Sequence, residues 1–141
     1  MMKKTIVCWL LLSFSIGMEA QNLHFKDGKF KIAQFTDLHY KLGNPASRQA
    51  TDCLYEIVKA EQPDLVVLTG DVIYSKPGDM CLQQVLNVLS DLKVPFCYLL
   101  GNHDPEQGIP VNQLYDQAQQ NSYCVQPKRN GNTLDYALPI K

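Results

Sequence analysis

Three short apolar runs stand out along this chain of 141 residues, at about residues 30–36, 64–69 and 96–100. Each run is followed directly by an acidic residue or by a glycine. Short continuous runs rich in β-branched and aromatic residues are typical of strands that are covered on both faces, as in a parallel sheet. The pattern therefore predicts three buried strands that stop abruptly.

Apolar residues at helical spacing fill the segment between the first two runs. Asn44 followed by Pro45 favours a helix start, because asparagine caps free amides and proline suits the first turn. We expect this helix to reach about Glu61, since Pro63 follows closely. Its apolar stripe consists of Ala50, Cys53, Leu54, Ile57 and Val58.

A second helix is predicted between the second and third runs, with Asp79 as its N-cap. Pro95 ends it, because a proline disfavours helical backbone in the residue before it. A weaker helix is expected over residues 111–120. The stripe of the second helix consists of Leu82, Val85, Leu86, Leu89 and Leu92.

The predicted order of elements is β-α-β-α-β, which indicates an α/β domain with a parallel sheet and right-handed crossovers. Two more β elements are expected outside this unit. Asp27-Gly28 favours a hairpin turn ahead of the first run, and residues 133–140 favour a last strand. The whole domain would occupy residues 21–141.

The N-terminal residues 1–20 differ in kind from the rest. Two lysines precede an almost wholly apolar stretch at residues 6–18. This is the pattern of a secretory signal peptide, and the stretch is shorter than the roughly 20 residues of a membrane-spanning helix. We expect cleavage after Ala20, or alternatively after Gly17, and export to the periplasm or the extracellular space. No stable membrane anchor is then expected.

The net charge of −1 and the lack of a long basic cluster argue against nucleic-acid binding. Beyond the signal peptide, cysteines occur at positions 53, 81, 97 and 124. In an exported protein they could form disulfides. Cys53 and Cys97 fall on predicted apolar faces, however, and no C-x-x-C spacing occurs. Buried free thiols are therefore favoured, and a zinc ribbon is not indicated.

Metal-capable side chains follow all three predicted strands. Asp37 and His39 follow the first, Asp71 follows the second, and Asn102 and His103 follow the third. The carboxyl ends of parallel strands meet at one edge of a sheet, where ligands commonly bind. Each short motif also occurs alone in ordinary loops. Their coincidence at one edge predicts a site.

The chemistry of these side chains indicates the kind of ion. Asp, His and Asn combine hard oxygen with borderline nitrogen donors and include no thiolate, which suits Mn, Fe, Zn or similar ions. Two such ions about 3.5–4 Å apart can hold a phosphoryl group during in-line displacement. His24, by contrast, lies in the predicted hairpin without such neighbours and is expected to be structural.

The segments FTDLHY, LTGDVIY and LLGNHD resemble the first three motifs of the calcineurin-like metallophosphoesterases, which are D-x-H, G-D and G-N-H-D. The resemblance covers about residues 29–105 and is nearest to exported bacterial members related to purple acid phosphatases. It implies half of a four-layer αββα sandwich. It also implies hydrolysis of phosphate mono- or diesters by two metal ions, with a bridging hydroxide as nucleophile.

The same resemblance implies a role for each matching residue. Asp37 and His39 would bind the first metal. Asp71 would bridge both metals, and Asn102 would bind the second. His103 would not be a ligand but would lie near the substrate phosphate, where it stabilises charge or protonates the leaving oxygen.

Two further residues require separate treatment. Asp104 is expected to orient His103 or to fix the loop, not to bind metal. Tyr74 has the G-D-x-x-Y spacing of true purple acid phosphatases, in which this tyrosine binds ferric iron. Those enzymes carry glycine where this chain has His39, so we expect Tyr74 to pack beside the site instead.

The family's later G-H and G-H-x-H motifs have no counterpart after Asp104, where no histidine occurs. We therefore expect the chain to be an N-terminal fragment that is poorly soluble, binds metal weakly and is inactive alone. The expected substrate of the whole enzyme is a small phosphate ester. The alternative is a non-catalytic scaffold that binds a protein partner, but a scaffold would not need His103.

Overall fold

The computed structural model describes residues 23–131 and 133–141, and the predicted signal peptide lies outside them. A parallel sheet of three strands in the order β1-β2-β3 forms its centre. The alternation of strands and helices confirms the predicted α/β class. The elements are β1 (Ile32–Phe35), α1 (Pro45–Glu61), β2 (Leu65–Thr69), α2 (Gly78–Leu92), β3 (Phe96–Leu99), the short 3-10 helix η1 (Asp104–Gln107) and α3 (Val111–Gln119).

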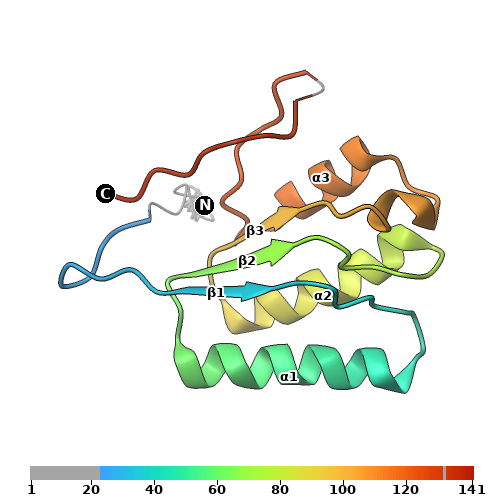
Figure 1. The fold of residues 1–141 in the computed structure, drawn as a ribbon, viewed down its shortest axis with the longest axis horizontal. Helices are drawn as coiled ribbons and strands as arrows, with labels where there is room; N and C mark the ends of the chain where they lie inside the picture. The colour runs from blue at the N-terminus through green and yellow to red at the C-terminus, as the bar shows by residue number, and fades with distance from the viewer. Residues whose placement is uncertain (1–22, 132) are drawn as a thin grey trace, which may run out of the picture.

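The helices α1, α2 and α3 share one hydrophobic core with a single face of the sheet. Figure 1 shows α1 and α2 running beside the strands and α3 lying next to β3. The register places Val66 beside Phe96 and Leu68 beside Tyr98. All four side chains are fully buried in the core. Burial of this face therefore fixes the alignment of β2 and β3.

The opposite face of the sheet is only partly covered, so the prediction of strands buried on both faces is wrong for β1. Ile32 in this edge strand is 52% exposed, and Leu99 at the end of β3 is 40% exposed. The cause is that all three helices lie on one side. The C-terminal segment adds some cover, because the Tyr136 hydroxyl contacts the Tyr98 carbonyl at 3.5 Å.

Helix α1 begins as predicted, with the Asn44 side chain accepting a hydrogen bond from the amide of Ala46 at 2.9 Å. Its predicted stripe is only partly right, because Cys53 is exposed and Ile57 is 40% exposed. The helix is rotated so that two polar residues face inward, where hydrogen bonds satisfy them. Its buried residues are Ser47, Thr51, Leu54 and Val58.

Helix α2 buries four of the five residues of its predicted stripe, and Leu92 is half-buried, although Asp79 is not the N-cap. The helix begins at Gly78, with Pro77 in the capping position and Asp79 inside the first turn. An acidic residue there still favours the positive end of the helix dipole. The third predicted helix is confirmed as α3.

The Asp27-Gly28 turn forms as predicted, but a longer hairpin does not. Lys26 and Lys29 exchange two backbone hydrogen bonds of 2.9 Å. Asp27 and Gly28 have φ angles of 50° and 69°, as a type I′ turn requires. The arm after the turn pairs elsewhere, because the amide of Lys31 donates to the carboxylate of Asp64 at 2.8 Å.

The prediction of a strand at residues 133–140 is wrong. Two isolated bridges involve this segment: Ile140 pairs with Leu23, and Thr133 pairs with Asn130. Leu23 lies outside the strands of the sheet, so its pairing with Ile140 does not connect the segment to the sheet. The segment is extended but does not extend the sheet.

Two of the four described cysteines, Cys81 and Cys97, are buried free thiols, as predicted. Cys53 departs from the prediction because it lies on the outer side of α1. Burial raises the pKa of Cys97 and raises that of Cys124 to about 12, so these thiols stay protonated at neutral pH. Among the described residues, no helix is both long and apolar enough to span a bilayer.

Candidate active site

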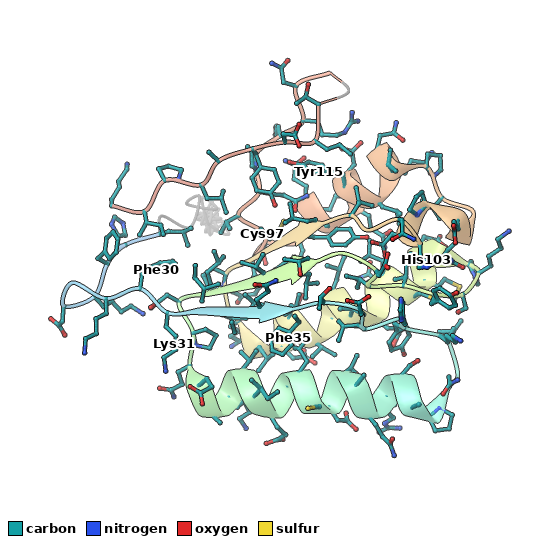
Figure 2. The ribbon with its side chains drawn as sticks, in the orientation of Figure 1. Phe30, Lys31, Phe35, Cys97, His103 and Tyr115 are labelled. Atoms are coloured by element: carbon teal, nitrogen blue, oxygen red, sulfur yellow. The ribbon has the colours of Figure 1, made fainter. Side chains whose placement is uncertain are left out.

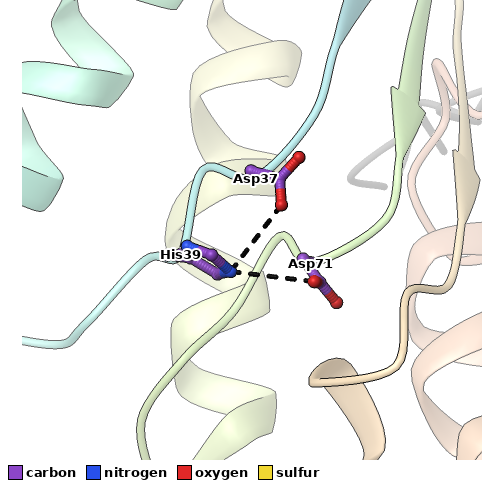
Figure 3. A group of neighbouring side chains, drawn as sticks. All are labelled: Asp37, His39 and Asp71. Atoms are coloured by element: carbon purple, nitrogen blue, oxygen red, sulfur yellow. Dashed lines mark ion pairs between the residues drawn. The ribbon is translucent and has the colours of Figure 1, made fainter.

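Three loops meet at the carboxyl edge of the sheet and carry the predicted polar side chains. Figure 2 places His103 near this edge, at the end of the sheet opposite Phe30 and Lys31. Figure 3 shows Asp37, His39 and Asp71 gathered where the loops after β1 and β2 approach each other. These residues thus meet at the carboxyl edge of the sheet, as the order of the strands predicted.

Backbone hydrogen bonds continue the pairing of β1 and β2 beyond the strands. The amides of Asp37 and His39 donate to the carbonyls of Gly70 and Asp71 at 3.1 and 3.0 Å. Asp37, His39 and Asp71 have positive φ angles of 55°, 45° and 50°. Such backbone is uncommon outside glycine and persists only where the surroundings enforce it. The pairing between the two loops supplies that enforcement here.

Two glycines allow the loops after β2 and β3 to touch. A Cβ atom on Gly101 would lie 2.1 Å from Asp71 Oδ1 and 2.3 Å from the Asp71 amide. A Cβ atom on Gly70 would lie 2.7 Å from the Gly101 backbone, and Gly70 has a φ of 98°. Any larger residue at position 101 would displace the Asp71 carboxylate. The glycine before each motif therefore makes room for the site.

Asp37, His39 and Asp71 form a cluster that could hold a metal ion. His39 Nε2 lies 3.9 Å from Asp37 Oδ1 and 3.7 Å from Asp71 Oδ2. One ligand atom from each residue lies within 4.8 Å of the other two. These separations are too long for hydrogen bonds but suit donors that converge on one cation, with bonds of about 2 Å.

The His39 ring has a buried polar atom that lacks a hydrogen-bond partner within the part of the chain that the structure describes. This atom is Nε2. A buried polar atom normally has a partner, because an unpaired one costs free energy. A cation between His39 and the two carboxylates would supply the missing interaction.

Asp71 also connects the cluster to the loop after β3. Its Oδ1 atom accepts a hydrogen bond from the amide of His103 at 2.9 Å, and its Oδ2 atom faces His39. Asn102 lies between Gly101 and His103 and is exposed. Both chain neighbours of Asn102 therefore contact Asp71, which keeps this residue at the edge of the cluster.

Asp104 fixes the loop, which was one of the two roles expected for it. Its side chain is fully buried, and its two oxygens accept hydrogen bonds from the amides of Ile73 at 3.0 Å and Gly101 at 2.7 Å. The carboxylate thus ties the loop after β2 to the loop after β3. Charge-assisted bonds of this kind are stronger than neutral ones.

Glu106, which the sequence analysis did not single out, orients the His103 ring. His103 Nδ1 lies 2.7 Å from Glu106 Oε2, and the hydrogen bond raises the pKa of the imidazole. The two residues are three apart, and His103 is the N-cap of η1. The short helix was not predicted from the sequence; a histidine followed three residues later by an acid was the available signal.

Tyr74 packs beside the site, as predicted. Its ring centroid lies 4.7 Å from that of His39 and 4.9 Å from that of His103. Lys41 Nζ lies 4.9 Å from the centre of the same ring. His24 lies apart from this group, beside a cavity of about 530 Å³ that Phe30 and Pro95 help to line.

Comparison with known proteins gives an independent result. The sequence profile described as "Calcineurin-like phosphoesterase" matches residues 30–139. This range includes every residue of the cluster, the loop after β3 and the helices between the strands.

Individual relatives carry related descriptions. A "Probable inactive purple acid phosphatase 29" from Arabidopsis thaliana is 29% identical, over 77% of this chain and 33% of its own length. An uncharacterized metallophosphoesterase from Campylobacter jejuni is 36% identical, over 72% of this chain and 25% of its own. A "Probable cyclic nucleotide phosphodiesterase" from Psychrobacter arcticus is 33% identical, over 55% of this chain and 32% of its own. The chain thus spans about a quarter to a third of these relatives.

Proposed function

The chain belongs to the calcineurin-like phosphoesterase family, and on that premise we propose that it hydrolyses small phosphate mono- or diesters with the help of two metal ions. The observation that carries the proposal is the convergence of Asp37, His39 and Asp71, whose ligand atoms lie within 4.8 Å of one another. The bond from the His103 amide to Asp71 adds a candidate proton donor at the same place.

The residues present fit a divalent metal ion. Two carboxylates and an imidazole supply the hard and borderline donors that Mn, Fe or Zn accept, and the buried Nε2 atom of His39 has no hydrogen-bond partner within residues 23–131 and 133–141. Asp37 and His39 would hold one ion, Asp71 would contact both ions, and Asn102 would hold the second. When bound, such ions acidify coordinated water and neutralise charge on phosphoryl oxygens.

His103 is the proposed proton donor. Water adds to phosphorus while the bond from phosphorus to the leaving oxygen breaks, and the proton on His103 Nε2 passes to that oxygen. The proton lost by the attacking water returns to the imidazole or to solvent. Because Nδ1 is engaged by Glu106, Nε2 is the ring atom left for this transfer.

Metal binding can be measured on the purified protein by calorimetric titration with Mn²⁺. We expect Asp71→Asn to weaken binding at least about 10-fold, because the variant removes a charge shared by both proposed ions. Asp79→Asn is the control, since Asp79 is an exposed acid in the first turn of α2. Equal affinities of Asp71→Asn and the unchanged protein would contradict the assignment.

Activity is tested with 4-nitrophenyl phosphate and bis(4-nitrophenyl) phosphate in the presence of Mn²⁺ or Fe²⁺. The assay uses the 141-residue chain and any longer reading frame that contains it. We expect His103→Ala to lower kcat at least about 100-fold, the low end for loss of general acid–base catalysis. His24→Ala is the matched control, and unchanged activity of His103→Ala would refute the role of His103.

A scaffold function is the second candidate, because some relatives are named as inactive. The Arabidopsis thaliana protein named as a probable inactive phosphatase is similar over 77% of this chain. A metal-loaded protein from a longer reading frame that contains this chain, without esterase activity towards either substrate, would favour a scaffold. The presence of His103 with an oriented ring favours catalysis.

We propose that the protein acts outside the cytoplasm, in the periplasm or the extracellular space. The support is the charged start, apolar stretch and small residues of residues 1–20. Fractionation of cells that express the full chain, followed by N-terminal sequencing of the product, would show export and cleavage near Ala20. A cytoplasmic, uncleaved product would contradict this proposal.

A further inference from the structure

Glu106 holds the His103 imidazole in a defined orientation. The carboxylate Oε2 atom lies 2.7 Å from His103 Nδ1, well within hydrogen-bond distance. Nε2 makes no hydrogen bond within the part of the chain that the structure describes. Because the two ring nitrogens differ only in their partners, the contact to Glu106 determines which one carries the proton in the neutral ring.

The backbone that carries this pair is held on several sides. The His103 amide donates to Asp71, and the His103 carbonyl accepts a bond from the Gln107 side chain at 3.0 Å. Asp104, the first residue of η1, is anchored by both of its oxygens. The Tyr74 ring stands edge-on to His103, with an interplanar angle of 81°. With the main chain fixed, Glu106 controls the remaining freedom of the ring.

The ring also lies beside the proposed metal cluster. The centroids of His103 and His39 are 5.9 Å apart. A rotation of His103 about its side-chain bonds would move the ring relative to this region without breaking the fold. A partner at Nδ1 prevents that rotation.

We propose that Glu106 is a positioning residue: its carboxylate accepts a hydrogen bond from the Nδ1–H group of His103 and thereby leaves Nε2, which carries the second proton of the imidazolium, for proton transfer to the leaving oxygen. This inference rests on the proposed phosphoesterase function. Glu106 acts through His103 and contacts neither substrate nor metal. It should therefore matter more for turnover than for substrate binding.

The first test reads the tautomer directly and needs no activity. The chain contains three histidines, so long-range ¹H–¹⁵N correlation spectra resolve each imidazole, and His103→Asn identifies the signal of His103. With neutral rings in the metal-free protein, we expect His103 to carry its proton on Nδ1. In Glu106→Ala the proton should move to Nε2, the form that free side chains prefer, and Glu56→Gln, an exposed control, should change nothing. An unchanged His103 signal in Glu106→Ala would overturn the proposal.

The second test measures hydrolysis. We expect Glu106→Ala to lower kcat about 10–100-fold with little change in KM, the range seen when a partner that orients a functional histidine is lost. The loss should be larger for phenyl phosphate than for 4-nitrophenyl phosphate, because the poorer leaving group needs the proton more. Glu106→Gln should recover part of the loss, since its amide oxygen can still accept the Nδ1 proton.

A double variant separates positioning from a general structural effect. If Glu106 acts through His103, Glu106→Ala should cause no further loss in a His103→Ala background. A full additional loss there would overturn the proposal. If neither the chain nor a longer reading frame that contains it hydrolyses these esters, the proposed function fails, while the spectra still decide whether Glu106 sets the tautomer.

Discussion

Two aspartates flank strand β2: Asp64 directly precedes it, and Asp71 follows Gly70 at its other end. The two carboxylates have different partners. Asp64 and Asp71 are similarly buried, with side chains 13% and 14% exposed. Asp64 accepts a bond from the Lys31 amide at 2.8 Å and contacts Lys26 Nζ at 2.6 Å. Asp71 has one oxygen bonded to the His103 amide, and the other faces His39 at 3.7 Å.

The difference separates an acid with two paired oxygens from an acid that we propose as a metal ligand. Both oxygens of Asp64 are paired with cations or amides, so Asp64 holds the chain that enters β1 against the start of β2. Asp71 keeps one oxygen for a ligand, and it sits on backbone with a positive φ. Asp64 at the amino edge is thus paired within the chain, whereas the carboxyl edge has ligand atoms that could hold a cation.

The largest effect is expected from Gly101→Ala. Its Cβ atom would meet Asp71 Oδ1 at 2.1 Å, so the loop must shift, at a cost of about 3 kcal/mol in the free energy of unfolding. Mn²⁺ binding should be lost as well. Denaturant unfolding and calorimetric titration measure both quantities. Gly43→Ala is the control, because nothing lies within 4 Å of its Cβ position and only its φ of 75° is strained; equal effects of the two variants would contradict the argument.

Asp104→Asn should lower the free energy of unfolding by about 2 kcal/mol. The asparagine side chain has one oxygen and one NH₂ group, so one of the two backbone amides would lose its acceptor. The acid is fully buried between Ile73 and Gly101, so solvent cannot replace the bond. Chemical denaturation gives the value. Asp116→Asn removes a partly exposed ion pair with Arg129 and should cost less; a larger loss there would count against Asp104 as the anchor.

Addition of Mn²⁺ should stabilise the protein, because the carboxyl edge binds the ion only when folded. At tenfold the dissociation constant the gain is about 1.4 kcal/mol, and a chelator should reverse it. Thermal melting with and without the ion measures the shift. Asp37→Asn should abolish most of the gain, while Asp64→Asn should retain it; the opposite result would remove the distinction between the two edges.

The smallest effect is a change in acid stability at Asp64. Hydrogen bonding to Lys26 and then to the Lys31 amide lowers the pKa of this carboxyl below its usual 3.8. A group with a lowered pKa stabilises the fold above its ordinary pKa and loses that contribution as the pH falls through the lowered value. Asp64→Asn should therefore flatten the acid limb of the stability curve below about pH 4. An unchanged limb in melts between pH 2 and pH 6 would show that the pair contributes nothing.

The order of elements and the location of the site could be predicted from the sequence because both depend on local patterns. Apolar runs, helical stripes and turn residues identify β-α-β-α-β. Parallel strands then bring Asp37, Asp71 and His103 to one edge. The resemblance to the phosphoesterase family, not these patterns, implied that Tyr74 would pack beside the site and that Asp104 could fix the loop.

Features that depend on packing between distant segments were not predictable in this way. The rotation of α1, which leaves Cys53 exposed, follows from hydrogen bonds that let Ser47 and Thr51 face inward. Residues 133–140 do not join the sheet, and the outer edge of β3 is paired with residues 124–125 instead, through the bridge between Phe96 and Cys124. Neither the rotation of α1 nor the position of residues 133–140 can be read from the periodicity of a single segment.

The sequence therefore predicts which types of side chain lie at the site. The tertiary structure determines how these side chains contact one another. Asp, His and Asn at the strand ends indicate metal chemistry wherever the strands lie in parallel. Only the folded chain shows that Gly101 admits the Asp71 carboxylate, that His39 Nε2 is without a partner and that Glu106 orients His103. Those relations join residues on separate loops or depend on the 3-10 helix η1, which the sequence did not predict.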